Sequence, residues 1–141
     1  LIQRVKVNVA NSMTDVIEAC SLFNKSFDHL SGDFISEDEY ESLLKENSII
    51  IALDANTNQF LGALHVKMEG KVVVLGQVAV VENARGRGVG KALVDTFVEW
   101  NKDTDKTRYQ LWVQRQNKSA VNMYLNKGFK YVNKSTISLI K

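Results

Sequence analysis

The sequence predicts one α/β domain over residues 1–141, built on a mixed β-sheet, with the element order β-α-α-β-β-β-α-β-α-β-β. Its length and its composition, with 45% apolar and 24% charged residues, are those of one ordinary globular domain. Apolar patterns of period 2 and period 3.6 alternate along the chain, which predicts interleaved strands and helices. The single cysteine excludes an internal disulfide framework, so the fold must depend on a packed core.

The first third of the chain predicts one strand followed by two helices. Residues 4–9 alternate apolar and polar side chains, as a half-buried strand does. From residue 14 to residue 27 the apolar positions recur at three- and four-residue steps, with Ser12 or Thr14 available as N-cap. Ser36 and the glutamate three residues after it have the spacing of a capping box, which predicts a short second helix.

The middle of the chain predicts three strands and the strongest helix. Residues 48–53 and 60–68 are strand-like runs joined by polar residues 54–58, which predicts a hairpin. Residues 71–81 are apolar on both faces, as a central strand of a sheet is. From Gly88 the period becomes 3.6, with one apolar stripe formed by Val89, Leu93, Phe97 and Trp100.

The last third predicts a strand, a helix and two further strands. Residues 109–113 are expected to form the strand and residues 119–127 the helix, with Asn117 as N-cap and Gly128 as the residue after the C-cap. Residues 129–140 supply the terminal strands. An exposed terminal strand would allow edge pairing with a second copy, so a monomer and a homodimer both remain open.

Several function classes are excluded by composition. No apolar run approaches the roughly 20 residues that a membrane span needs. Nothing at the start of the sequence resembles a secretion signal, so a cytoplasmic protein is expected. The surroundings of Cys20 lack the paired spacing of a zinc site, so no metal is expected.

Charge is distributed unevenly between the two halves of the chain. Residues 1–70 hold eleven acids and five bases, a balance of −6, whereas residues 71–141 hold five acids and thirteen bases, a balance of +8. The second half therefore suits an anion. Its bases are scattered and are not interleaved with exposed aromatic residues, which argues against nucleic acid and favours a small phosphorylated ligand.

Residues 85–91 read Arg-Gly-Arg-Gly-Val-Gly-Lys and connect the predicted central strand directly to the strongest predicted helix. Glycines let backbone N–H groups approach an anion without interference from a Cβ, and a helix N-terminus adds about half a positive charge. Arg85, Arg87 and Lys91 add full charges. The combination indicates a site for a diphosphate; the plainer interpretation is a tight turn with solvated bases.

Two other phosphate motifs do not match this segment. A dinucleotide-binding fingerprint needs Gly-x-Gly-x-x-Gly near the first strand, but Gly86, Gly88 and Gly90 alternate and come late in the chain. A phosphate-binding loop of the nucleotidase kind ends in Gly-Lys-Ser/Thr, whereas Ala92 follows Lys91 here.

Two segments resemble the motifs of the GNAT superfamily of N-acetyltransferases. Residues 85–90 have the Arg-x-x-Gly-x-Gly form of its acyl-CoA-binding motif and follow an apolar strand end at residues 78–80. Residues 117–129 are similar to the family's Asn-x-x-Ala-x-x-x-Tyr-x-x-x-Gly-Phe segment. With the family's separation between them and its element order, the resemblance covers nearly the whole chain. It implies a GNAT-like acyl-CoA N-acyltransferase fold and a transferase that uses acetyl-CoA as cosubstrate, without a metal.

The resemblance also implies roles for particular residues. The pyrophosphate of acetyl-CoA would lie over the backbone of residues 87–91, and the pantetheine arm would pair with residues 78–80 like an added strand. The Val80 N–H would stabilise the oxyanion, and Tyr124 would hydrogen-bond or protonate the departing sulfur. The plainer alternatives are an ordinary buried strand at Val80 and a packing role for Tyr124. The implied cofactor contacts are Val78, Ala79, Val80, Arg85, Gly86, Arg87, Gly88, Val89, Gly90, Lys91, Asn117, Ala120 and Tyr124.

No residue is assigned as the base that accepts the proton of the amine. Relatives often place Glu or His on the strand equivalent to residues 71–81, but the candidates in its second half are not titratable: Val74, Gly76 and Gln77. Glu82 is either a base or a solvated turn residue, and the solvated role is favoured. His65 is expected to be structural, and His29 is the other imidazole.

The acceptor is approached through the acidic residues that gather around the first two helices, namely Asp28, Asp33, Glu37, Asp38, Glu39, Glu41 and Glu46. This surface predicts attraction for a cationic amine such as a polyamine, an aminoglycoside-like sugar or a lysine-bearing peptide; a solvated helix face is the alternative. Trp112 and Arg115 are candidates for lining the acceptor pocket, with core packing as the alternative for Trp112. Cys20 is expected in the core, not as a nucleophile.

The sequence thus predicts a cytoplasmic N-acetyltransferase that moves an acetyl group from acetyl-CoA to a primary amine by direct attack on the thioester. Because no base is evident, a non-catalytic acyl-CoA-binding regulatory domain is the alternative, and an interaction module without ligand is a third class. The expected partners are acetyl-CoA and an amine acceptor, not nucleic acid or a membrane.

Overall fold

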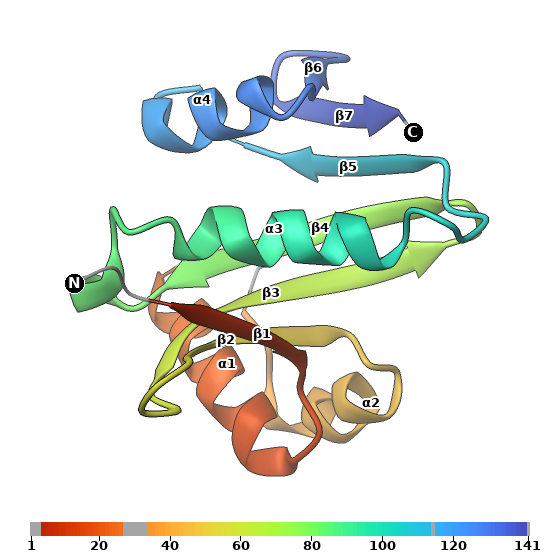
Figure 1. Ribbon diagram of the computed structural model, residues 1–141. Coiled ribbons are helices and arrows are strands. Elements are labelled where there is room, and N and C mark those ends of the chain that lie inside the picture. Colours follow the sequence, from red (N-terminus) through yellow and green to blue (C-terminus); the bar gives the residue numbers. More distant parts are fainter. Residues whose placement is uncertain (1–3, 27–33, 114, 141) are drawn as a thin grey trace. The chain divides into compact units, whose positions relative to one another are not determined.

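The structure is a computed structural model that describes residues 4–26, 34–113 and 115–140. Its seven-stranded sheet has the spatial order β1-β2-β3-β4-β5-β7-β6 (Figure 1). The strands are β1 (Val5–Val9), β2 (Ile49–Asp54), β3 (Phe60–Glu69), β4 (Val72–Val80), β5 (Arg108–Trp112), β6 (Lys130–Tyr131) and β7 (Thr136–Ile140). The helices are α1 (Met13–Ser26), α2 (Tyr40–Lys45), α3 (Val89–Trp100) and α4 (Lys118–Asn126), with short 3-10 turns η2 (Glu37–Glu39) and η3 (Glu82–Ala84).

The predicted element order and mixed sheet are confirmed, and so are most of the predicted helix ends. Ser12 is the N-cap of α1, because its Oγ accepts the Asp15 N–H at 3.2 Å. Ser36 and Glu39 form the predicted capping box. Gly128 follows α4 with φ 100°, a conformation that suits glycine. The predicted last residue of the first helix, Phe27, lies outside the described residues.

One detail of the prediction is refined and another is wrong. The terminal residues 129–140 form two strands: β7 pairs with β5 on one side and, through Ile137 and Ser138, with the two-residue strand β6 on the other, so β6 is the edge of the sheet. Edge pairing with a second copy stays a prediction. Trp100 does not continue the buried stripe of α3: it is the last residue of the helix and is 42% exposed, whereas Val89, Leu93 and Phe97 are buried.

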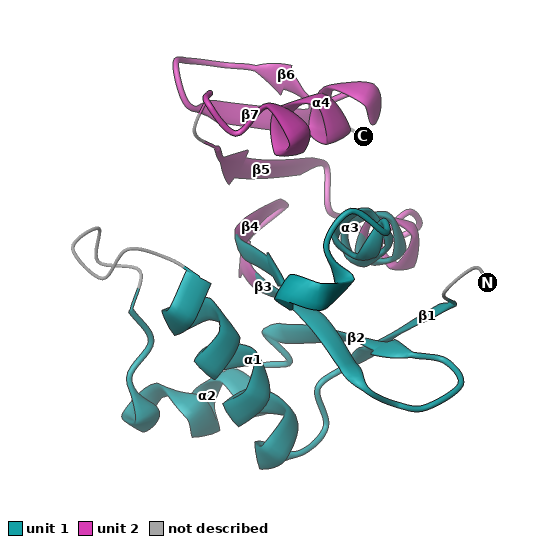
Figure 2. Ribbon diagram, turned by 90° about the vertical axis from the view of Figure 1, so that its left-hand side faces the viewer, with its two compact units in different colours: residues 1–65, 77–97 teal, residues 66–76, 98–141 magenta. Residues whose placement is uncertain are grey.

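The chain divides into two compact units, residues 1–65 with 77–97 and residues 66–76 with 98–141 (Figure 2). In the first unit α1 and α2 lie side by side, and α1 packs on β2. The core of this unit joins α1 to three strands through Val16, Ala19, Cys20, Phe23, Ile49, Ile51, Ala63 and Ala79. Burial of these apolar side chains supplies the main stabilisation of the unit.

Cys20 is fully buried in this core, as predicted. Burial, and secondarily the negative charge of Glu39, raise the pKa of its thiol to about 11. At neutral pH the thiolate is therefore scarce, and Cys20 is a packing residue without nucleophilic character.

Asn24 near the end of α1 binds the backbone of Ile35, close to the start of the next described segment. Its Oδ1 accepts the Ile35 N–H at 2.8 Å, and its Nδ2 donates to the Ile35 carbonyl at 2.8 Å. The side-chain amide thus satisfies both backbone groups of Ile35, a buried residue of the core. Residues 24 and 35 are fixed to each other.

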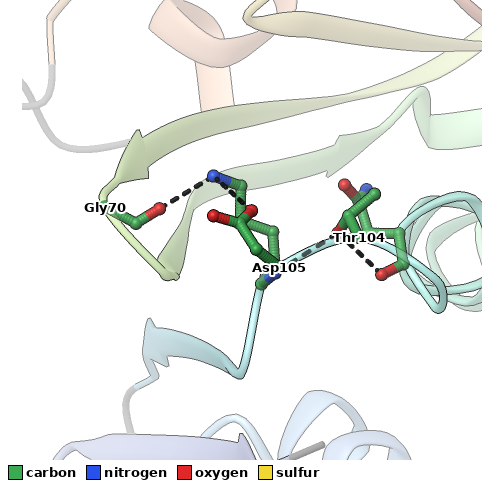
Figure 3. A network of polar contacts seen from close by, with 5 residues as sticks. Gly70, Thr104 and Asp105 are labelled. Atoms are coloured by element: carbon green, nitrogen blue, oxygen red, sulfur yellow. Dashed lines mark hydrogen bonds and ion pairs between the residues drawn. The ribbon is translucent and has the colours of Figure 1, made fainter.

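In the second unit, a lysine holds the turn between β3 and β4 (Figure 3). Lys106 Nζ donates to the Gly70 carbonyl at 2.8 Å and lies 3.5 Å from Asp105 Oδ1. The Lys106 N–H donates to Thr104 Oγ1 at 3.3 Å, and that hydroxyl donates to the Asn101 carbonyl at 2.9 Å. These bonds connect the end of α3 to the Gly70 turn.

Candidate functional site

The second half of β4 extends past its pairing with β5. The two strands are parallel, and the register joins Val72–Leu75 to Arg108–Leu111, whereas β4 continues to Val80. The Val81 N–H donates to the Leu61 carbonyl of β3 at 2.9 Å. Because successive peptide groups along a strand point to opposite edges, the N–H and C=O of Val80 point to the edge away from β3. That edge is the one that an extended ligand would pair with.

The side chains at the end of β4 alternate between two faces. Ala79 is 6% exposed and belongs to the core that contains Cys20. Val78 and Val80 are half-buried on the other face, where side-chain carbons lie 3.7 and 3.9 Å from the position of a Cβ on Gly90. The first turn of α3 therefore rests on Val78 and Val80, and Ala79 offers a ligand only its backbone.

The connection from β4 to α3, which we call the glycine turn (residues 81–88), is exposed at its glycines. Gly86 and Gly88 have φ angles of 77° and 80°, and a Cβ on either would meet no atom within 4 Å. Both positions thus favour glycine for backbone conformation and leave the space outside the turn open. Gly90 has no positive φ angle, so the backbone conformation favours glycine at only two of the three glycine positions in this motif.

The N-terminus of α3 has the properties of an anion site. Its first turn is closed by the bond from the Ala92 N–H to the Gly88 carbonyl, at 2.9 Å. The N–H groups of residues 89–91 precede that bond and have no acceptor within the helix. They lie at the positive end of the dipole of a 12-residue helix. Exposed Arg85, Arg87 and Lys91 surround this end in the sequence, and Lys91 Nζ pairs with Asp95 Oδ2 at 2.9 Å.

Arg85 folds back over the turn. Its Nε donates to the Val80 carbonyl at 3.2 Å. The turn beneath it is closed by the Ala84 N–H to the Val81 carbonyl at 3.0 Å and the Arg85 N–H to the Glu82 carbonyl at 3.3 Å. The sequence identifies Arg85 only as a charge near a phosphate and does not reveal its bond to β4.

The sequence alone also does not identify Gly62 on β3 as a position where the backbone is closely approached. A Cβ there would lie 2.7 Å from the Ala79 carbonyl oxygen and 3.2 Å from Val89 Cγ1. The absence of a side chain lets β3, the end of β4 and the start of α3 approach one another. An isolated glycine within an apolar strand was the available signal for such an approach.

In the second unit, Asn117 and Tyr124 belong to α4. Asn117 is the predicted N-cap, and its Oδ1 accepts the Ala120 N–H at 3.3 Å. Tyr124 is 5% exposed, and its ring meets Phe129 edge-on with centroids 5.4 Å apart. Burial raises the pKa of Tyr124 to about 12. Tyr124 therefore packs in the interior of its unit, and its phenol stays protonated at neutral pH.

The residues considered as bases have unremarkable surroundings. Glu82 is exposed in the first turn of η3. His65 is half-buried on β3, with its ring 6.4 Å from that of Phe23. His29 lies outside the described residues, and Gln77 is 7% exposed on β4. None of these positions identifies a base.

The acidic region is only partly described. Asp28 and Asp33 lie outside the described residues. Glu39 accepts the Ser36 N–H at 2.9 Å, and Asp38 accepts the Ser36 hydroxyl, so these two carboxylates cap η2. Glu37 is exposed in the same turn.

Trp112 and Arg115, the two candidates for lining the acceptor pocket, lie at and just after the end of β5. Trp112 is 70% exposed at the end of β5, so core packing does not explain it. Arg115 Nε donates to the Lys134 carbonyl at 2.7 Å, and its guanidinium lies 4.0 Å from the Tyr131 ring centroid. Arg115 therefore joins the start of the β5–α4 connection to the hairpin of β6 and β7, in addition to any role toward an acceptor.

Among residues 4–26, 34–113 and 115–140, His, Cys, Asp and Glu do not form a group of three that could hold a metal ion. Within the same ranges, each helix is too short or too polar to cross a membrane.

Comparison with known proteins places these features in a family. The sequence model of the acetyltransferase (GNAT) family matches residues 16–129. An uncharacterized N-acetyltransferase of Methanocaldococcus jannaschii, MJ1207, is 33% identical over 73 residues, 50% of this chain and 32% of that protein. An uncharacterized N-acetyltransferase of Bacillus subtilis, YobR, is 34% identical over 55 residues, 39% of this chain and 22% of that protein. The aligned region thus spans a third or less of either relative.

Solved structures share the fold over nearly the whole chain. Ard1 from Thermoplasma volcanium has a TM-score of 0.77 at 19% identity and covers 96% of this chain and 97% of its own. The PaiA N-acetyltransferase from Thermoplasma acidophilum, solved in complex with coenzyme A, has a TM-score of 0.71 at 17% identity, covering 98% and 99%. A chain of the NatC complex bound to Gag peptide and CoA has a TM-score of 0.81 at 19% identity, also covering 98% and 99%.

Proposed function

Because the chain belongs to the acetyltransferase (GNAT) family, we propose that it transfers the acetyl group of acetyl-CoA to a primary amine. The observation that carries the proposal is the junction of β4 and α3. There, open glycines with positive φ and the first N–H groups of α3 come directly after a strand edge that ends at Val80. The coenzyme A bound to the similar PaiA structure supports the same ligand class.

We propose that the glycine turn and the first turn of α3 hold the pyrophosphate. A Cβ on Gly86 or Gly88 would fill open space that the phosphates need. The N–H groups at residues 87–91 and the charges of Arg87 and Lys91 would hold the anion. The pantetheine arm would pair with the edge of residues 78–80 as an added strand.

In the chemical step, the amine nitrogen forms a bond to the thioester carbon, and the carbonyl oxygen takes up the electron pair. The Val80 N–H points to the edge where that oxyanion would form and would donate to it. Collapse of the tetrahedral intermediate breaks the C–S bond and releases the CoA thiolate. The amine must arrive unprotonated, with two protons on its nitrogen. The amide product keeps one of them, and the other passes to solvent, since no base is assigned.

For Tyr124 we propose, on the resemblance, a hydrogen bond to the departing sulfur. With a pKa of about 12, full proton transfer to a thiolate with a pKa near 8.5 would run uphill by about 5 kcal/mol. Hydrogen bonding to the developing thiolate avoids that cost. Tyr124→Phe should lower kcat about 10- to 100-fold, the effect of one hydrogen bond to a charged group, with KM for acetyl-CoA unchanged.

The control for Tyr124 is Tyr109→Phe. Tyr109 is buried in the same unit, and its hydroxyl finds no hydrogen-bond partner among the described residues. Equal loss of kcat in both variants would refute a specific role for the Tyr124 hydroxyl.

We propose that the acceptor is a cationic small molecule or peptide, attracted by the acidic residues around η2. Exposed Glu37 is the described member whose carboxylate is best suited to test this. Glu37→Gln should raise KM for a cationic amine about twofold at low salt, since exposed charges interact weakly. Glu18→Gln is the control, because Glu18 is an exposed residue of α1; equal or absent effects would remove the support for a cationic acceptor.

The first test is thermal stabilisation by acetyl-CoA. At 100 times its Kd, acetyl-CoA should stabilise the protein by about 2.7 kcal/mol, which raises Tm by several degrees. Gly88→Glu should abolish the shift, because it places a side chain with negative charge in the phosphate position. Gly70→Glu is the matched control for Gly88→Glu, since Gly70 also has a positive φ angle (63°) and open space where a Cβ would lie.

Release of the CoA thiol during an amine screen then distinguishes the two function classes. Thiol release with one amine, and its absence in Gly88→Glu, would support the transferase. Binding of acetyl-CoA without thiol release from any amine would favour the regulatory alternative, which the lack of an assigned base allows. No stabilisation at millimolar acetyl-CoA would refute both.

A further inference from the structure

The bond from Arg85 to Val80 lies at the point where the thioester would be held. Arg85 is exposed and follows Val80 by five residues, yet its Nε returns to the Val80 carbonyl at 3.2 Å. The backbone bonds within residues 81–85 already close the turn. The side-chain bond is therefore an additional connection between the glycine turn and the last peptide of β4.

The chemistry of a thioester explains why this carbonyl needs a donor from the protein. Val80 presents its N–H and its C=O on the same edge, because Val81 bonds to Leu61 on the other. An acetyl thioester opposite Val80 has a carbonyl oxygen that can accept from the N–H, but it has no N–H to give in return. A peptide strand in the same place would satisfy both groups. With a thioester there, the Val80 carbonyl would have no partner on the ligand unless a side chain supplied one, and a carbonyl that the bound ligand shields from water is costly to leave unpaired.

We propose that Arg85 is a positioning residue for the oxyanion donor. Its Nε–H gives the Val80 carbonyl the bond that a thioester cannot give. It thereby fixes the peptide at the end of β4 so that the Val80 N–H stays directed at the thioester oxygen. This inference rests on the proposed function, since it requires acetyl-CoA on that edge. It assigns Arg85 a role distinct from that of Arg87, the other arginine of the turn, whose part is charge alone.

The length of the side chain separates the two roles. The Nε2 of glutamine is the same number of bonds from Cα as the Nε of arginine, so Arg85→Gln keeps a donor at the same position and removes the charge. Arg85→Met has a similar length and offers neither donor nor charge. A positioning role therefore predicts that Gln rescues and Met does not. A role in phosphate binding predicts that both fail equally. Arg87→Gln and Arg87→Met provide the same pair at the control position.

The measurement is the infrared band of the thioester carbonyl in ¹³C-labelled acetyl-CoA, with each protein saturated with ligand and the spectrum of its free CoA complex subtracted. Wild type should shift the band to lower frequency than in an aprotic solvent, because hydrogen bonding to Val80 polarises the bond. The shift should persist in Arg85→Gln and be lost in Arg85→Met. Both Arg87 variants should bind acetyl-CoA several-fold more weakly and retain the shift at saturation.

The outcomes separate this inference from the proposed function. Absence of acetyl-CoA binding by wild type overturns both. Binding with a shifted band that Arg85→Met retains overturns the positioning role and leaves the proposed function standing. Equal loss of the shift in Arg85→Gln and Arg85→Met also overturns it, because the effect would then depend on charge. Arg85 and Arg87 are both exposed, so all four variants should fold, and loss of the single Arg85 bond should lower the Tm without ligand by no more than a few degrees.

Discussion

The two ends of β4 contain similar residues and present different surfaces. A glycine with positive φ lies just before the strand, at Gly70, and two lie just after it, at Gly86 and Gly88. At each end a basic side chain donates to a backbone carbonyl: Lys106 to Gly70 at 2.8 Å and Arg85 to Val80 at 3.2 Å. Glycines and bases alone therefore do not distinguish a structural turn from a ligand site.

The secondary structure after each glycine makes the difference. After Gly70 comes a strand, and Val72–Leu75 pair with β5, so the ladder uses their peptide groups. After Gly88 comes α3, whose first N–H groups have no acceptor within the helix. The anion site that we propose at the second end thus depends on the helix N-terminus, and the glycines leave it open.

The largest effect that would break this comparison is expected at Gly62, beneath the second end of β4. Gly62→Ala would place a Cβ 2.7 Å from the Ala79 carbonyl oxygen and should destabilise the protein by about 1–3 kcal/mol. Gly90→Ala is the control, because its Cβ would meet only ordinary contacts at 3.7 and 3.9 Å. Urea unfolding checks both. Equal stability of the two variants would show that the second end of β4 has room to spare.

The stability of the protein at alkaline pH tests whether water reaches the core next to the second end of β4, because Cys20 and Ala79 belong to the same buried cluster. The pKa of Cys20 is raised from 9.0 to about 11. The unfolded chain therefore loses this proton at a lower pH than the folded chain does. The contribution of the Cys20 proton to the free energy of unfolding is fully present below pH 9 and is lost as the pH rises through 11. The loss should reach about 2 kcal/mol by pH 11. Cys20→Ala should unfold with a flatter dependence between pH 8 and 11; an identical slope would place water beside the thiol.

At the first end of β4, Lys106→Met should cost about 1 kcal/mol of unfolding free energy, the net contribution of one hydrogen bond. Acetyl-CoA should stabilise this variant as much as wild type, since the Gly70 turn is assigned a structural role only. Lys102→Met, which removes an exposed ion pair with Glu99, is expected to leave the free energy of unfolding nearly unchanged, because water screens exposed charges. A weaker response of Lys106→Met to acetyl-CoA would contradict the separation of the two ends.

The smallest expected effect is a gain at the second end. Asp95 pairs with Lys91 at 2.9 Å and partly neutralises its charge near the N-terminus of α3. Asp95→Asn should therefore tighten acetyl-CoA binding about twofold at low salt, with the gain vanishing at 1 M salt, where charges are screened within about 3 Å. Isothermal titration at the two salt concentrations checks this; weaker binding of the variant would show that Asp95 assists the site.

The element order could be predicted from apolar periodicity, since most of the helices and strands bury apolar side chains at regular steps. Cap chemistry was predictable because it is local: Ser36 and Asn117 make bonds to residues three positions away. The tight turn between the central strand and the strongest helix was predictable from its glycines, and Gly86 and Gly88 have positive φ angles. The binding role that the resemblance implies for this turn stays a prediction.

The features that escaped prediction depend on contacts between segments far apart in the chain or on backbone direction. The pairing of β7 between β5 and β6 is a choice of sheet order that periodicity does not encode. The Gly62 approach needs the position of Ala79 on the neighbouring strand. The Arg85 bond depends on the edge of the sheet to which the Val80 carbonyl points, and the sequence does not show that direction. The exposure of Trp112 likewise depends on the surface that other elements leave uncovered.

The pair of hydrogen bonds between Asn24 and Ile35 restricts which side chain position 24 can hold. Both backbone groups of Ile35 lie 2.8 Å from one amide, so the side chain must accept at one atom and donate at another. Ionised aspartate only accepts and leucine does neither, whereas asparagine has both groups at this length. Position 24 is thus as constrained as a core position, although its side chain contributes a polar amide and not apolar surface.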